Sequence, residues 1–133
     1  MRNETSAYIR EEFKKAEHSL KAAQKLIAEN LNEDAISRAY YAVFHSARCA
    51  LKAKSVETTK HQNLISQFAL HLVKPGVIEL EYGDILRQAK EDRETGDYEP
   101  FVTFSHEEAA RLVQDAERFV IRIKQFLKDS NLL

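Results

Sequence analysis

The chain has 133 residues, of which 44% are hydrophobic and 31% charged, so its length predicts a single domain over residues 1–133. A formal net charge of −1 gives no overall indication of a nucleic-acid-binding protein, and three Gly and two Pro are too few for the frequent turns of an all-β fold. No stretch approaches the ~18 apolar residues of a membrane span and no hydrophobic run follows Met1, so we expect a cytoplasmic protein that contacts no membrane.

The first two predicted helices are joined by a short polar turn. Apolar residues at alternating spacings of three and four predict a helix from about Thr5 to Glu29. Asn30 is expected to end this helix and Asn32 to cap the next, which runs from about Glu33 to Lys54.

Three further helices follow. The capping-box sequence Thr59–Gln62 opens the third, which ends before Pro75–Gly76. The fourth covers about Val77 to Glu94, and a second capping box at Ser105–Glu108 opens the last, which continues to about Leu127. Long antiparallel helices with short connections predict an all-α, up-and-down bundle of four to five helices.

The predicted second helix has two faces that water should not reach. Its core face consists of apolar residues at helical spacing, namely Ile36, Tyr40, Val43, Ala47 and Ala50. The opposite side, which also carries Arg38 and His45, is lined by small residues: Ala35, Ala39, Ala42, Ser46, Cys49 and Ala53. Small residues let another backbone approach closely, so we expect this second face to meet either another helix of the bundle or a second subunit.

Arg38 and His45 lie roughly opposite the core face of the same helix. They are seven positions apart, which places them ~20° apart around the helix axis and ~10 Å apart along it. Such a pair can be exposed side chains without a function, can bind an acid such as Asp84, Asp92 or Asp97, or can bind a phosphate. The segment from Arg38 to His61 contains several basic residues and the single acid Glu57, which is typical of a solvated helix face or of a phosphate-binding patch.

Other candidate sites have weaker support. One Cys and scattered His residues lack the spacing of a zinc site, so we expect no metal or cofactor. Near the end of the fourth helix, Asp97 is expected to pair with Arg93. The alternative is that Arg93 or Tyr98 reaches the Arg38/His45 cleft.

The string from Ser37 to Arg48, SRAYYAVFHSAR, resembles the signature helix of the HEPN domain, the higher-eukaryote and prokaryote nucleotide-binding domain. That family is marked by an Arg, four to six intervening residues and a His; here six residues intervene. Lys60–His61 and the stretch from Arg93 to Tyr98 also resemble small stand-alone prokaryotic HEPN proteins, and the resemblance spans roughly Ala7 to Leu127.

This resemblance implies a helical bundle that dimerises through the motif helices. Many members are metal-independent endoribonucleases, often toxins encoded beside a minimal nucleotidyltransferase partner. Others bind nucleotides or act as interaction modules without catalysis. The chain departs from the pattern at Ala39, because catalytic members frequently have a polar residue directly after the Arg.

On this basis we expect His45 to act as general acid or base and Arg38 to bind the scissile phosphate of RNA. Tyr41 is expected either to contact substrate or to pack, and Arg48 and Lys52 to extend the phosphate track. His61 is expected either to contact substrate or to make local hydrogen bonds at the helix start. In a homodimer, each subunit would contribute one Arg and one His to a shared cleft. The alternative function is a non-catalytic nucleotide-binding or protein-interaction module that works with a nucleotidyltransferase.

Overall fold

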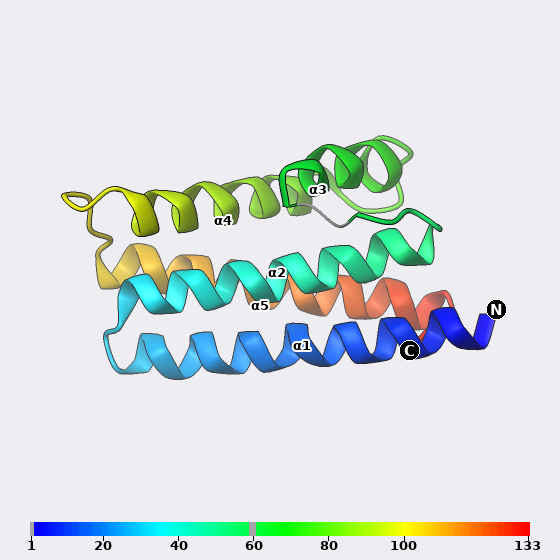
Figure 1. Ribbon diagram of the computed structural model, residues 1–133, viewed down its shortest axis with the longest axis horizontal. Helices are drawn as coiled ribbons and strands as arrows, with labels where there is room; N and C mark the ends of the chain where they lie inside the picture. The colour runs from blue at the N-terminus through cyan, green and yellow to red at the C-terminus, as the bar shows by residue number, and fades with distance from the viewer. Residues whose placement is uncertain (1, 59–60) are drawn as a thin grey trace.

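The computed structural model describes residues 2–58 and 61–133, and within these ranges it is a bundle of α-helices without strands (Figure 1). The elements are α1 Arg2–Ala28, α2 Asn32–Ala53, α3 His61–Phe68, the π-helical segment η1 Ala69–Val73, α4 Leu80–Tyr98 and α5 His106–Asp129. The all-α bundle predicted from the helical periodicity is confirmed. None of the helices in the described ranges is long and apolar enough to cross a membrane.

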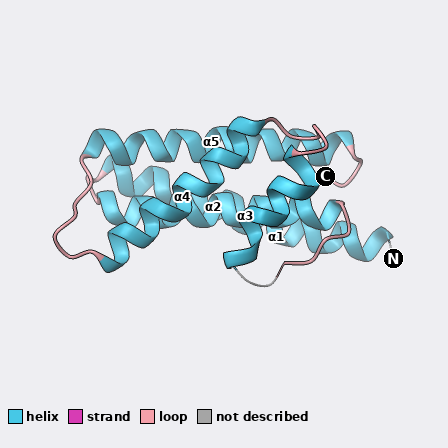
Figure 2. Ribbon diagram, turned by 90° about the horizontal axis from the view of Figure 1, so that it is seen from above, coloured by secondary structure: helices cyan, strands magenta, loops and turns pink. Residues whose placement is uncertain are grey.

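The second helix is the centre of the bundle. α1, α2 and α5 run side by side along the long axis, and both chain termini lie at the same end of the molecule (Figure 1). α3 and α4 cover another side of α2, and α4 crosses the long axis obliquely when seen from above (Figure 2). The predicted core face of α2 is buried throughout, and the Tyr40 side chain on it is among the largest fully buried ones.

The small face of α2 packs against α1. Ala39, Ala42 and Cys49 are each 0% exposed, and the Cys49 thiol donates a hydrogen bond to the backbone carbonyl of Ile9 at 3.5 Å. Of the two expected occupants of this face, the structure therefore places another helix of the same chain there. The small side chains allow the two backbones to approach closely, which brings side chains at the edges of the contact within reach of one another.

The turn between α1 and α2 is partly as predicted. Asn30 adopts a left-handed conformation with φ 62°, and the Leu31 N–H bonds back to the Leu26 carbonyl at 3.0 Å, so Asn30 ends α1 as expected. The expectation that Asn32 caps α2 is wrong. Asn32 is already the first helical residue, and its side-chain amide donates to the Phe104 carbonyl at 3.2 Å, which ties the start of α2 to the loop before α5.

The later helices differ from prediction at their ends. α4 begins at Leu80 rather than Val77 and continues through Gly96 to Tyr98 instead of ending at Glu94. An ion pair one turn apart, between Arg93 and Asp97, supports this last turn.

The two predicted capping boxes have different outcomes. Ser105 and Glu108 form theirs as expected, with two hydrogen bonds of 3.0 Å. The one predicted at Thr59–Gln62 lies outside the described part of the chain. The helix that follows it changes to π-helical hydrogen bonding after Phe68, which its sequence did not predict.

Candidate functional site on the exposed strip of α2

The predicted site residues lie along the only strip of α2 that solvent reaches between Ala35 and Leu51. In this stretch the side chains that are not buried are those of Ser37, Arg38, Tyr41, His45 and Arg48. Lys52 continues the same line one turn further and is also partly exposed. The remaining faces of the helix are covered by α1, α4 and α5. We call this line of residues, from Arg38 to Lys52, the α2 strip.

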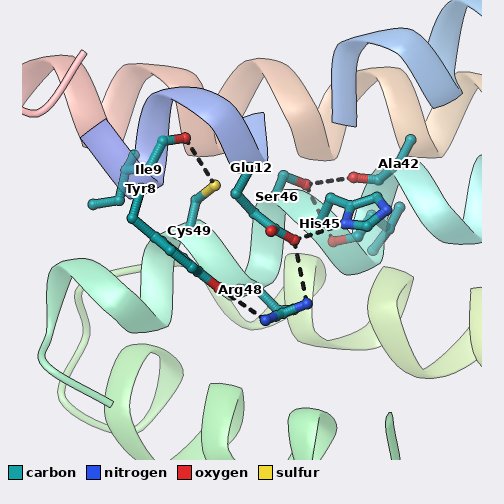
Figure 3. A network of polar contacts seen from close by, with 9 residues as sticks. Tyr8, Ile9, Glu12, Ala42, His45, Ser46, Arg48 and Cys49 are labelled. Atoms are coloured by element: carbon teal, nitrogen blue, oxygen red, sulfur yellow. Dashed lines mark hydrogen bonds and ion pairs between the residues drawn. The ribbon is translucent and has the colours of Figure 1, made fainter. Parts of the chain in front are cut away.

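His45 is held by a carboxylate that comes from α1. Its Nδ1 lies 2.7 Å from Oε2 of Glu12, and the two side chains are 18% and 7% exposed (Figure 3). The Arg48 guanidinium lies 3.5 Å from the same Glu12 oxygen and donates a hydrogen bond of 2.8 Å to the Tyr8 hydroxyl. One carboxylate of α1 therefore fixes two residues of the α2 strip.

The pKa of Glu12 reflects two opposing effects. Burial acts to raise the pKa, because a charge is poorly solvated there. The hydrogen bond with His45 and the positive charge of Arg48 outweigh burial, so the pKa of Glu12 lies below its ordinary value. The side chain is therefore a carboxylate at neutral pH and acts as a hydrogen-bond acceptor only.

Arg38 differs from Arg48 in forming no ion pair with the described residues. Its side chain is exposed, and it forms no hydrogen bond or ion pair with any residue of the described ranges. Asp84, Asp92 and Asp97, which the sequence suggested as partners, each pair with another residue of α4. The Arg38 guanidinium is thus available to an anionic ligand, which it can bind through its planar set of donors.

Tyr41 links the strip to α4. Its ring centroid lies 6.2 Å from that of His45, and the Arg93 guanidinium lies 5.2 Å from the Tyr41 ring on another side. Arg93 also pairs with Asp97 at 3.3 Å, so the expected ion pair forms. The same arginine also lies over the rings of Tyr40 and Tyr41 on α2.

The C-terminal part of the strip borders a cavity. It has a volume of about 190 Å³ and is lined by Tyr8, Arg48, Lys52, Val56, Glu57 and Thr58. Lys52 pairs with Glu57 at 2.7 Å and lies over the Tyr8 ring. The buried Thr58 hydroxyl has no hydrogen-bond partner among the residues that the structure describes. The arrangement offers cations and a free hydroxyl group to a phosphate.

Two other expectations concern groups beyond the strip. The side chain of His61 and the neighbouring Lys60 lie outside the described part of the chain. Within that part, no group of three or more His, Cys, Asp or Glu side chains converges in a way that could hold a metal ion.

Comparison with known proteins identifies the family. The HEPN domain model matches residues 9–126, which is most of the chain. The chain belongs to the HEPN domain family. A protein of Methanocaldococcus jannaschii named "Putative toxin" is 41% identical over 91% of this chain and 92% of its own length. A second protein of that organism with the same kind of name is 29% identical over 91% of the chain and 82% of its own length. A Thermotoga maritima protein named "UPF0332 protein" is 30% identical over 96% of each chain.

The departure from the HEPN pattern at Ala39 has a structural setting in this chain. Ala39 is 0% exposed and belongs to the small face that packs against α1. Its side chain therefore does not share the accessible strip with Arg38 and His45.

Glu12 and Tyr8 are the parts of this HEPN site that sequence reasoning missed. Both lie on α1, far from the signature helix along the chain. The available clue was that Glu12 lies one turn after Ile9 and one turn before Ala16, both of which are 0% exposed. A carboxylate in such a position requires a partner, although the sequence did not indicate which one.

Proposed function

We propose that this HEPN chain is a metal-independent endoribonuclease and the toxin-like component of a toxin–antitoxin or defence system. The observation that supports this most directly is the content of the α2 strip. Between Ala35 and Leu51, most of α2 is buried, yet solvent reaches Arg38, a cationic group that forms no ion pair with the described residues, two turns from a half-buried imidazole, His45. The similarity to proteins named as toxins supports the biological setting.

The proposed reaction uses the nucleophile that RNA itself contains. An imidazole nitrogen of His45 takes the proton of the 2′-hydroxyl as its oxygen attacks the neighbouring phosphorus. The bond from phosphorus to the 5′-oxygen breaks, and that oxygen receives a proton from a general acid. The products are a 2′,3′-cyclic phosphate and a free 5′-hydroxyl. Arg38 binds the phosphate oxygens and stabilises the negative charge that develops on them.

The other strip residues have binding roles in this proposal. Arg48 and Lys52, beside the cavity at the end of α2, bind phosphates further along the strand. Tyr41, between Arg93 and His45, contacts the substrate at the scissile position. His61 adds a further phosphate contact from the start of α3.

A homodimer would complete the site. Two chains that meet at their α2 strips bring two His45 imidazoles to one cleft, so that one acts as base and the other as acid. A minimal nucleotidyltransferase is the proposed partner protein, and the cytoplasm is the proposed location. If the chain binds nucleotides but cleaves no RNA, the alternative of a non-catalytic module applies.

The test compares the wild type with Arg38→Ala and His45→Ala on a mixed RNA pool in the presence of EDTA. Each substitution is expected to lower the cleavage rate by about 100-fold or more, since general acid–base catalysis contributes ~10²–10⁴. Arg87→Ala and His106→Ala, which change the same residue types at exposed positions away from the strip, should cleave like the wild type. An inert wild type, or equal activity of all variants, would overturn the proposal.

A further inference from the structure

We infer that Glu12 is a positioning residue for His45, which fixes the imidazole nitrogen that carries the proton. The inference rests on the proposed function for its catalytic meaning. The geometry behind it is the contact of 2.7 Å between Glu12 Oε2 and His45 Nδ1 at the buried junction of α1 and α2. Figure 3 shows the carboxylate reaching from α1 to the α2 strip between His45 and Arg48.

The contact between Glu12 and His45 determines which nitrogen of His45 carries the proton. A carboxylate has no hydrogen to donate, so the hydrogen bond forms only when His45 Nδ1 carries one. At 2.7 Å the bond has the length expected when one partner is charged. Because Glu12 is only 7% exposed, few water molecules compete for this oxygen. Neutral His45 is thereby held as the Nδ1–H tautomer, the opposite of the form that a free histidine side chain prefers.

The proton on Nδ1 in turn decides what the other ring nitrogen of His45, Nε2, can do. In the Nδ1–H tautomer, Nε2 carries the lone pair, and it lies on the ring edge away from Nδ1 and Glu12. This is the nitrogen that can accept the 2′-hydroxyl proton of a bound RNA. After the transfer the imidazolium is stabilised by the adjacent carboxylate, so the same contact serves both halves of the proton cycle.

Arg48 keeps the Glu12 carboxylate in place. The Arg48 guanidinium lies 3.5 Å from the same oxygen that contacts His45, and its other nitrogen donates to the Tyr8 hydroxyl. Glu12 and Tyr8 are four residues apart on α1, so Arg48 is anchored at two points of one helix face. We therefore assign Arg48 a second task beside phosphate binding, which is to hold Glu12 in the orientation that His45 needs.

A purely structural role of Glu12 would also connect α1 and α2, so loss of stability does not distinguish the two roles. The tautomer of His45 does distinguish them. Long-range ¹H–¹⁵N NMR spectra of histidine-labelled wild type, recorded as the pH is raised until the His45 signals no longer change, report which nitrogen is protonated. We expect His45 of the wild type to be Nδ1–H. A wild-type spectrum with His45 as Nε2–H would overturn the inference without any variant.

The variants test the consequence for catalysis. Glu12→Ala leaves Nδ1–H without its acceptor, so we expect the Nε2–H tautomer that a free histidine prefers and a loss of kcat of about 10–100-fold with little change in KM. Glu12→Asp keeps the charge and should retain the wild-type tautomer and most of the activity. Glu11→Ala is the matched control, because it removes the neighbouring exposed carboxylate, which pairs with Lys14.

The outcomes separate this inference from the proposed function. If Glu12→Ala keeps the Nδ1–H tautomer, or changes the tautomer while kcat stays at the wild-type value, Glu12 does not position His45 for catalysis. If the wild type cleaves no RNA but shows the Nδ1–H tautomer that Glu12→Ala reverses, the assignment of Glu12 stands and the nuclease proposal fails.

Discussion

At the scale of single residues, the site depends on one carboxylate oxygen that two basic side chains share. Removing water from Glu12 is unfavourable, and a lone buried carboxylate would be protonated. The nearby His45 and Arg48 offset this cost and keep the pKa of Glu12 below its ordinary value. Arg38, two turns from His45, forms no ion pair within the described ranges. The α2 strip therefore contains one side chain that is held in place, His45, and one that is available to bind an anion, Arg38.

A pH dependence of stability follows from the pKa of Glu12. The pKa in the folded state lies below the ordinary value of 4.5, so the folded chain binds fewer protons here than the unfolded chain does at acidic pH. The stabilisation is fully present above about pH 4.5 and is lost as the pH falls through the lower, folded-state pKa. Urea unfolding of the wild type and Glu12→Gln between about pH 7 and pH 3 should show a stability difference that shrinks with acidity. A constant difference would contradict this assignment.

At the scale of elements, α2 carries the site because every other face of it is occupied. The periodicity of its apolar residues predicted the core face, and the run of small residues predicted a second close contact. Periodicity cannot state which neighbour fills a face, since several helices of the chain have matching apolar stripes. The structure places α1 there, and this choice brings Glu12 to His45.

Overpacking of the small face tests how tightly α1 must approach. Ala39→Leu introduces three carbon atoms at a position that is 0% exposed between the two helices. We expect a loss of about 1–3 kcal/mol in the free energy of unfolding, measured by urea denaturation. Ala28→Leu, at the exposed end of α1, is the control and should change stability by less than about 0.5 kcal/mol. If Ala39→Leu unfolds like the wild type, the contact between α1 and α2 is looser than the structure indicates.

At the scale of the whole molecule, the open question is whether two chains share one site. The proposed dimer places Arg38 and His45 of both copies in one cleft. Arg38→Ala and His45→Ala homodimers would then each lack one residue type entirely, whereas a mixed dimer contains one of each.

Mixing the two inactive variants is therefore expected to restore part of the RNA cleavage, well below the wild-type rate, because a mixed dimer has one Arg38 to bind the phosphate and one His45 as base but lacks the second His45 as acid. Subunits are exchanged by joint refolding, and cleavage is then measured with the mixed RNA pool. Mixing either variant with the double variant Arg38→Ala/His45→Ala should restore nothing. Sedimentation equilibrium that shows only monomers at the assay concentration would contradict the shared site.

Four features could be predicted from the sequence, namely the helical class, the capping box at Ser105, the stop at Asn30 and the common line of Arg38 and His45 on one helix. Each of these depends on spacing or backbone chemistry within a few residues, which a sequence records directly. Three others became visible in the folded chain: α1 covers the small face, Glu12 contacts His45, and Asn32 binds the loop before α5. These contacts join residues 33 to 72 positions apart, and they depend on which helices pack together and how far each is rotated about its axis.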